Sequence, residues 1–148
     1  MKNSNFLRRL AVVAIALSSV LVFSSFTSAT NPQEESKSSL LSLIVEKMKE
    51  TLPLDLGSGM AMTDVYLTSN FLVVECTCSE TLVDLIRVGY KEMSREEAVK
   101  EILGNEAVKV LAKFCAECNY GMRYAYTNKT RTNICEMNFT VEELKMIP

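Results

Sequence analysis

Cysteine is the residue type in this sequence whose spacing could carry chemistry. The chain has five, in a C-x-C at Cys76 and Cys78, a C-x-x-C at Cys115 and Cys118, and singly at Cys135. C-x-x-C is the spacing of dithiol oxidoreductases, in which a helix N-terminus stabilises the attacking thiolate. Here the motif ends its predicted helix, where the helix dipole raises a thiol pKa instead. Its position therefore argues against redox catalysis.

Three other roles remain open for the cysteines: metal binding, disulfide formation and simple packing in the core. Cys76, Cys78, Cys115 and Cys118 could bind zinc if the strand and the helix end meet, although their spacing is not that of a common zinc fold. Oxidation competes with metal binding in an exported protein, so the sequence favours disulfides. Cys115 or Cys118 could then reach Cys135, with Cys76 or Cys78 reaching the other. In the third role, all five cysteines stay reduced and are buried as small hydrophobic side chains.

Outside the cysteines the sequence offers little for catalysis. It has no histidine, which excludes Ser-His-Asp and Cys-His mechanisms and His-ligated metals. Carboxylates are scattered singly, and no glycine loop of the phosphate-binding type is present. Tyr120, Tyr124 and Tyr126 could form an aromatic recognition surface, but alternate tyrosines on a strand are more typical of half-buried packing. We therefore predict no catalytic residue and no cofactor, and disfavour an enzyme.

The first residues indicate export. Lys2, Arg8 and Arg9 precede an apolar run over 10–23, and a small-residue cleavage site ends at Ala29. The run is shorter than the roughly 20 residues of a membrane span, so we predict a cleaved signal peptide over 1–29 and a periplasmic or secreted protein. No cysteine stands near the site to carry a lipid anchor, and we expect no membrane contact after cleavage.

The charge balance bears on partners. Removing the signal peptide would leave 13 Lys+Arg against 18 Asp+Glu, a formal charge of −5. This balance repels nucleic acid and anionic lipid, so neither is expected as a partner. The remaining 119 residues can bury about two thirds of their unfolded surface, enough for a core without a metal.

The elements that must position these side chains follow from periodicity. A polar stretch over 30–39 is predicted as a flexible leader, and 40–148 as a single domain. Helical spacing predicts helices over 40–51, 82–93 and 106–118 and a closing helix over 141–147. Ser79 can cap the second of these, a capping box at Ser94 begins a further turn or two to Leu103, and Thr140 begins another capping box. Alternating patterns predict two hairpins, one over 62–78 and the other over 121–139. The glycine-rich stretch between Leu52 and Met62 is predicted as an ordered loop.

The order helix, hairpin, two helices, hairpin, helix favours an α+β fold. We predict an antiparallel sheet of about four strands with helices packed on one face. In the strand over 71–78, alternation places Cys76 and Cys78 on one face, which we take as buried.

The chain also resembles a group of small exported bacterial proteins of unknown function. The resemblance rests on Leu52-Pro53 before the first hairpin and on the G-x-x-Y-x-Y of Gly121, Tyr124 and Tyr126. It implies the α+β arrangement and a periplasmic or secreted setting. It implies no catalytic residue, and the group's pattern lacks the cysteines at 76, 78, 115 and 118.

Three classes of function follow, of which the least favoured is a small hydrolase with a cysteine or carboxylate nucleophile and no histidine. The first is an exported, non-enzymatic binding or interaction module whose sheet face or edge meets a protein or small ligand. The second is a cysteine-dependent protein, acting by thiol exchange or binding zinc through four cysteines. The sequence favours the first.

Overall fold

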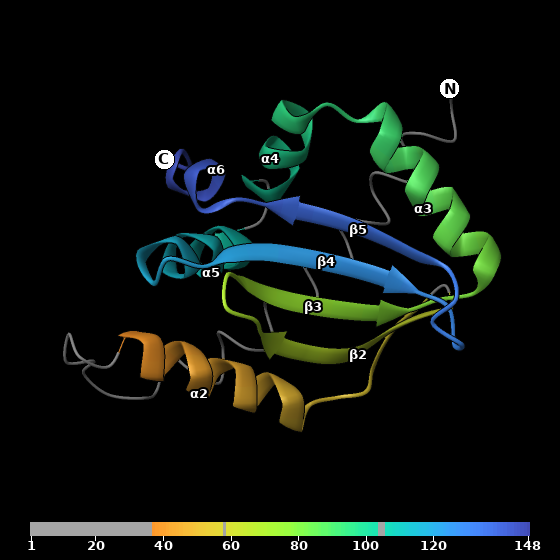
Figure 1. Ribbon diagram of the computed structural model, residues 1–148, viewed down its shortest axis with the longest axis horizontal. Helices are drawn as coiled ribbons and strands as arrows, with labels where there is room; N and C mark the ends of the chain where they lie inside the picture. The colour runs from red at the N-terminus through yellow and green to blue at the C-terminus, as the bar shows by residue number, and fades with distance from the viewer. Residues whose placement is uncertain (1–36, 58, 104–105) are drawn as a thin grey trace.

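The computed structural model describes residues 37–57, 59–103 and 106–148. The predicted signal peptide and leader, up to residue 36, lie outside these ranges. Ten elements follow one another along the described chain (Figure 1). They are α2 (Lys37–Glu50), β1 (Leu54–Gly57), β2 (Met60–Leu67), β3 (Phe71–Thr77), α3 (Glu80–Glu92), α4 (Arg95–Leu103), α5 (Glu106–Glu117), β4 (Gly121–Thr127), β5 (Ile134–Phe139) and α6 (Val141–Lys145).

The strands form one sheet in the order β1-β2-β3-β4-β5. The α+β class is confirmed, but the prediction of about four antiparallel strands is wrong, because the sheet has five and β3 pairs with β4 in parallel. Three helices connect those two strands. A connection of that length returns the chain to the starting end of the sheet, so the second hairpin adds beside the first in the same direction. The other pairings are antiparallel.

The additional strand is β1, which lies in the stretch predicted as a loop. Leu54 pairs with Met62, and the register shifts before Gly57. Gly57 has a φ of +80°, and its N–H donates to Oδ1 of Asp55 at 2.9 Å. Glycine adopts this conformation at little cost, so the segment turns tightly into β2. The sequence pattern did not predict this strand, because its proline, aspartate and glycine residues are typical of turns.

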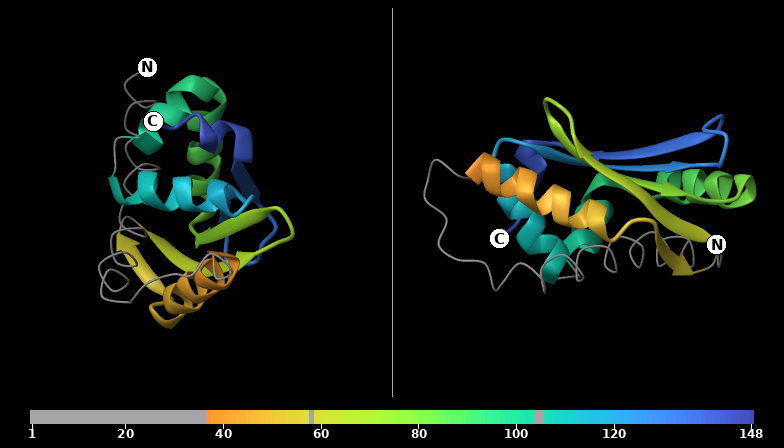
Figure 2. Two further views of the ribbon diagram at one scale, coloured as in Figure 1. Left: turned by 90° about the vertical axis from the view of Figure 1, so that its left-hand side faces the viewer. Right: turned by 90° about the horizontal axis from the view of Figure 1, so that it is seen from below.

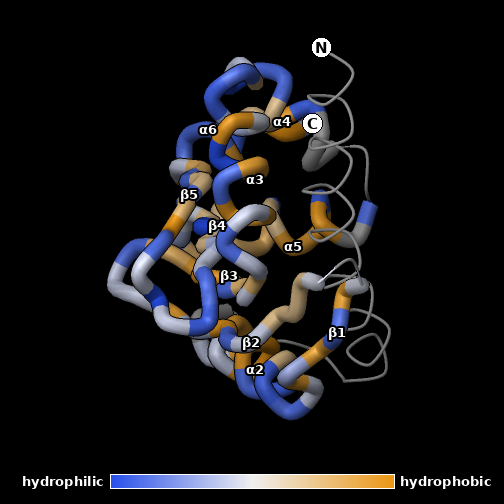
Figure 3. Tube along the Cα trace, turned by 90° about the vertical axis from the view of Figure 1, so that its right-hand side faces the viewer, coloured by the Kyte–Doolittle hydropathy of each residue, from blue (hydrophilic) through white to orange (hydrophobic). Residues whose placement is uncertain are grey.

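Helices cover one face of the sheet, as predicted. The right-hand view of Figure 2 shows the helices on one side of the strands, and in Figure 3 α5, which is coloured in part as hydrophobic, lies near β4, the strand that it contacts. Alternate side chains of β3, β4 and β5 join the helices in a single core. On the strands these are Leu72, Val74 and Cys76 of β3, Met122, Tyr124 and Tyr126 of β4, and Cys135, Met137 and Phe139 of β5.

The helix starts are set by local hydrogen bonds, as predicted. Ser79 caps α3 by accepting from the N–H of Leu82. Ser94 and Glu97 form a capping box before α4, and Thr140 and Glu143 form another before α6. Each pair satisfies N–H groups that have no partner within the helix. No helix in the described part of the chain is long and apolar enough to cross a membrane.

Candidate functional site

A hollow in the described surface lies where β3 and β4 end, and we call it the carboxyl-end cleft. Its volume is about 680 Å³. Because the two strands are parallel, both end at this edge, and the β1–β2 turn and the loop after β4 complete the walls. The lining residues are Asp55, Gly59, Met60, Ala61, Thr63, Thr77, Cys78, Ser79, Glu80, Asn128, Lys129 and Thr130.

The strand ends at the cleft are held together by the backbone. The N–H of Cys78 donates to the carbonyl of Thr127 at 2.7 Å, which extends the parallel ladder by one bond. Ser79 then begins α3 as its N-cap. The cleft therefore adjoins a strand end and a helix start that are fixed relative to each other.

Asn128 organises the loop that forms the other wall. Its side chain is buried and fully engaged: Oδ1 accepts from the N–H of Thr132 at 2.9 Å, and Nδ2 donates to Oε1 of Glu80 at 2.9 Å. A buried amide with all its partners fixes a single loop conformation. Further along, Arg131 has a left-handed φ of 59° and donates from Nη2 to both carboxylate oxygens of Glu75, at 2.5 and 2.6 Å.

The cleft is lined by hydroxyl groups and by charges of both signs. Thr63 and Thr77 share a hydrogen bond of 2.9 Å between their hydroxyl oxygens, and Asp55, Glu80 and Lys129 supply charges of both signs. No histidine exists in the chain to activate a hydroxyl. Burial raises the pKa of the Cys78 thiol to about 11, so at neutral pH this side chain is a poor nucleophile.

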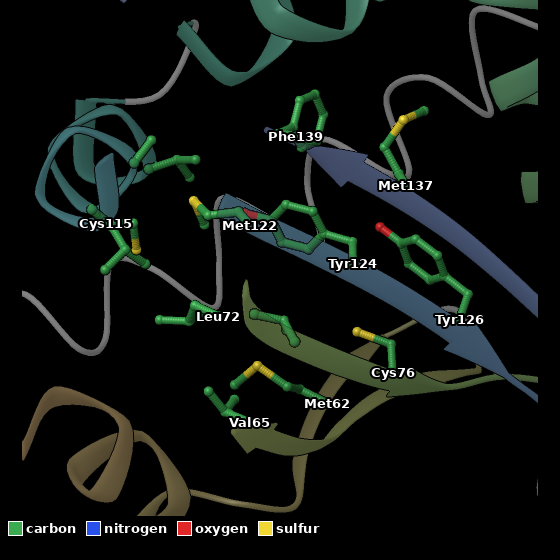
Figure 4. Packing of buried hydrophobic residues seen from close by; sticks show 14 of the residues in the cluster. Met62, Val65, Leu72, Cys76, Cys115, Met122, Tyr124, Tyr126, Met137 and Phe139 are labelled. Atoms are coloured by element: carbon green, nitrogen blue, oxygen red, sulfur yellow. The ribbon is translucent and has the colours of Figure 1, made fainter. Parts of the chain in front are cut away.

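The structure separates the cysteines into two places. Cys76 and Cys78 lie at the end of β3, on the side of Cys135 in β5, whereas Cys115 and Cys118 lie at the end of α5, before the start of β4. All except Cys118 are buried. In Figure 4, Leu72, Met122 and Tyr124 lie between Cys115 and Cys76. Among the described residues no group of three or more His, Cys, Asp or Glu side chains could hold a metal, so the four cysteines do not meet as a zinc site.

The predicted disulfides are absent, and the topology gives the reason. All five cysteines lie in the described residues, and no two sulfurs are bonded. Cys135 pairs with Tyr126 near the end of β4, whereas α5 leads into the beginning of that strand, so Cys115 is far from Cys135. Cys76 also pairs with Tyr126, from the other side. Two strand spacings separate Cys76 from Cys135, about 10 Å between Cα atoms, and a disulfide needs less than about 7 Å.

The tyrosines do not form an exposed surface. Tyr124 and Tyr126 are buried on the helix-covered face, and Tyr120, just before β4, is half-buried. The hydroxyl of Tyr90 donates to that of Tyr126 at 2.8 Å, with the ring centroids 5.7 Å apart. The Tyr124 hydroxyl is buried without a hydrogen-bond partner among the described residues. Burial raises the pKa of both β4 tyrosines well above the usual value.

Sequence reasoning missed the polar residues of the cleft. Thr63, Thr77 and Asn128 belong to no sequence motif of catalysis or ligand binding. The signal that could have located them was topological. Three helices between two strands favour a parallel crossover, and the carboxyl ends of parallel strands are where ligands bind in open sheets.

Comparison with known proteins identifies the fold alone. No family model matches the sequence, and no curated protein matches it. The structure is similar to the crystal structure of a candidate secreted protein from Pseudomonas aeruginosa, with a TM-score of 0.57 and 10% sequence identity. The match covers 78% of this chain and 99% of the other. The similarity therefore covers nearly the whole of that protein.

Thiol labelling tests the placement of the cysteines. In the native protein at pH 8, iodoacetamide should modify Cys118 first, because burial raises the pKa of Cys76 and Cys115 to about 12. A thiol of that pKa is ionised in about one molecule in ten thousand at pH 8. After denaturation without reductant, mass spectrometry should find all five cysteines labelled. A pair that resists labelling would show a disulfide that the structure lacks.

The two β4 tyrosines offer a matched pair of substitutions. Tyr126→Phe removes the acceptor of the Tyr90 hydroxyl and should lower the free energy of unfolding by about 1 kcal/mol. Tyr124→Phe removes a buried hydroxyl with no partner, so it should leave stability unchanged or raise it by up to about 1 kcal/mol. Urea denaturation measures both. A larger loss for Tyr124→Phe than for Tyr126→Phe would mean that a bound water satisfies the Tyr124 hydroxyl.

Proposed function

We propose that the protein is an exported, non-enzymatic binding module that takes a small polar ligand into the carboxyl-end cleft. The observation that carries the proposal is the cleft itself, about 680 Å³ at the carboxyl ends of the parallel pair. Ligand sites in proteins typically measure about 300–1,000 Å³, and in open sheets they favour this edge.

The side chains that line the cleft limit the chemical class of the ligand. The hydroxyls of Thr63, Thr77 and Thr130 can donate or accept, and the carboxylates of Asp55 and Glu80 accept. Lys129 is the cation among the lining residues. Groups of this mixture suit a ligand that carries several hydroxyl or amine groups rather than a single strong charge.

Two features support binding without turnover. The hydroxyls lack a neighbouring histidine, and the thiol of Cys78 is held protonated by burial. Nδ2 of Asn128 donates a hydrogen bond to Oε1 of Glu80 at 2.9 Å, and this bond fixes the wall of the cleft. Pre-formed walls lower the entropic cost of binding.

Export is the second part of the proposal. It is supported by the basic and apolar start of the sequence, and by a fold similar to that of a candidate secreted protein. An exported protein of this size suits a role in capturing a solute or presenting it to a partner outside the cytoplasm.

A titration monitored by amide NMR tests the ligand site. We expect at least one member of a panel of sugars, polyols and amino acids to shift the amides of Thr77, Lys129 and Thr130. The double variant Thr63→Val/Thr77→Val should weaken that ligand about tenfold while leaving the fold intact, because both members of a hydroxyl pair are replaced by isosteres.

Thr51→Val is the control, because its hydroxyl caps a carbonyl at the end of α2, outside the cleft. Equal weakening by the control, or perturbed amides that all lie elsewhere, would remove the cleft from the proposal. The cleft would also be excluded as the ligand site if no member of the panel shifted its amide signals.

The export proposal is tested by the N-terminus of the protein. When the full-length gene is expressed in a Gram-negative host, the periplasmic fraction should contain a chain that begins at Thr30. Intact-mass and N-terminal analysis measure this directly. A cytoplasmic protein that retains residues 1–29 would contradict export.

A further inference from the structure

The carboxyl-end cleft carries charges of opposite sign on two of its walls. Asp55 lies in β1, and Lys129 follows the end of β4. Both side chains are exposed, and in the part of the chain that the structure describes neither forms an ion pair. Glu80, the other charged lining residue, already accepts a hydrogen bond from Asn128. One acidic and one basic group therefore remain available to a ligand on different sides of the cleft.

The strand register sets the distance between these two walls. Asp55 begins a row of paired residues that crosses four strands and continues through Ala61, Thr77 and Thr127. Directly paired residues point to the same face of a sheet, so the carboxylate of Asp55 lies on the face of Thr77. Three strand spacings separate Asp55 from Thr127, about 14 Å between Cα atoms. Lys129 stands two residues beyond the far end of this row.

The hydroxyls between the two charges are arranged to accept hydrogen bonds. Oγ1 of Thr63 donates to the carbonyl of Glu75 at 3.4 Å, and it lies 2.9 Å from Oγ1 of Thr77. Because the Thr63 proton is used in the first bond, Thr77 donates in the second. A hydroxyl oxygen has two lone pairs, so this pair can still accept from N–H groups of a ligand. Met60 and Cys78, which are buried, add apolar atoms to the lining.

These groups discriminate among the small polar ligands that the cleft could take. A sugar or polyol leaves both charges without a partner, whereas an anion or a polyamine meets a like charge at one wall. A molecule with an ammonium group at one end and a carboxylate at the other meets an opposite charge at each. An extended peptide spans about 3.3–3.6 Å per residue, so about three residues fill the distance that the two side chains leave between the walls.

We propose that the carboxyl-end cleft binds a short zwitterionic peptide of about three residues. Its terminal ammonium group pairs with Asp55 and its terminal carboxylate with Lys129, while its amide N–H groups donate to the hydroxyl pair of Thr63 and Thr77. This inference rests on the proposed function, because it names the ligand class of the same cleft. The two charges also fix the direction in which the peptide lies.

Titration of the purified protein with alanine peptides, followed by amide NMR, tests the proposal. The probe is trialanine, and its matched controls are N-acetyl-trialanine and trialanine amide, each of which lacks one terminal charge. We expect trialanine to shift the amides of Thr77, Lys129 and Thr130 and to bind at least threefold more tightly than either control. Equal affinities of the three peptides, or no binding of trialanine at millimolar concentration, would overturn the proposal.

Two substitutions locate the termini separately. Asp55→Asn removes the charge but keeps Oδ1, which accepts from the N–H of Gly57, so the turn after β1 is preserved. This variant should bind trialanine and N-acetyl-trialanine within twofold of each other and still discriminate against the amide. Lys129→Gln should show the converse. Lys113→Gln, on α5 outside the cleft, should keep both preferences. Either cleft variant that keeps both preferences would contradict the assigned pairing.

The ligand comparison also separates this inference from the proposed function. Cleft amides that shift with a sugar or polyol but not with trialanine would reject the peptide and retain the cleft as the ligand site. Cleft amides that shift with none of these ligands would reject both.

Discussion

The parallel pairing of β3 with β4 is the constraint on which the rest of the structure depends. Seven residue pairs run in unbroken register from Phe71 with Gly121 to Thr77 with Thr127. The ladder is extended at both ends, by the N–H of Gly121 bonded to the carbonyl of Asn70 and by the N–H of Cys78 bonded to that of Thr127. A parallel pair requires a crossover, and α3, α4 and α5 supply it while covering one face. The carboxyl-end cleft exists because both strands end together.

The same pairing explains a close approach of the backbone to its neighbours at Gly121. A Cβ placed on Gly121 would lie 2.5 Å from the carbonyl oxygen of Phe139 and 2.7 Å from the ring of Phe71. Glycine is needed here for space, since its φ is not in the left-handed region. The Phe71 ring in turn lies 4.4 Å below the guanidinium carbon of Arg123, so the start of β4 is closed on the face that no helix covers. The G-x-x-Y-x-Y motif thus combines a close approach at Gly121 with two buried tyrosines.

Local features of the sequence were predictable, and features that depend on distant pairing were not. The caps at Ser79, Ser94 and Thr140 were found because they need only three or four consecutive residues. The common face of Cys76 and Cys78 followed from the alternation of a strand. The direction of β4 and the existence of β1 depend on partners elsewhere in the chain, which no local pattern encodes.

The candidate site was harder still to predict, because its members are ordinary polar residues. Thr77 and Asn128 acquire a common role only after the parallel pairing places the ends of β3 and β4 side by side. The prediction of disulfides between the cysteines was wrong for the opposite reason: these residues form a pattern in the sequence but do not come together in the fold. Their spacing resembles a motif in sequence, yet Cys76 and Cys115 lie at different ends of the core, with Leu72, Met122 and Tyr124 between them in Figure 4. Their raised pKa values follow from that burial and indicate packing.

The two edges of the sheet show how such a fold avoids pairing with copies of itself. β1 is short, with four residues, and it ends at a glycine turn. β5 is longer, and its outward carbonyls at Ile134 and Asn138 are occupied by Arg87 and Arg95. An incoming strand would have to displace two guanidinium groups, each also bonded to a carboxylate. Continuous sheet extension is therefore disfavoured.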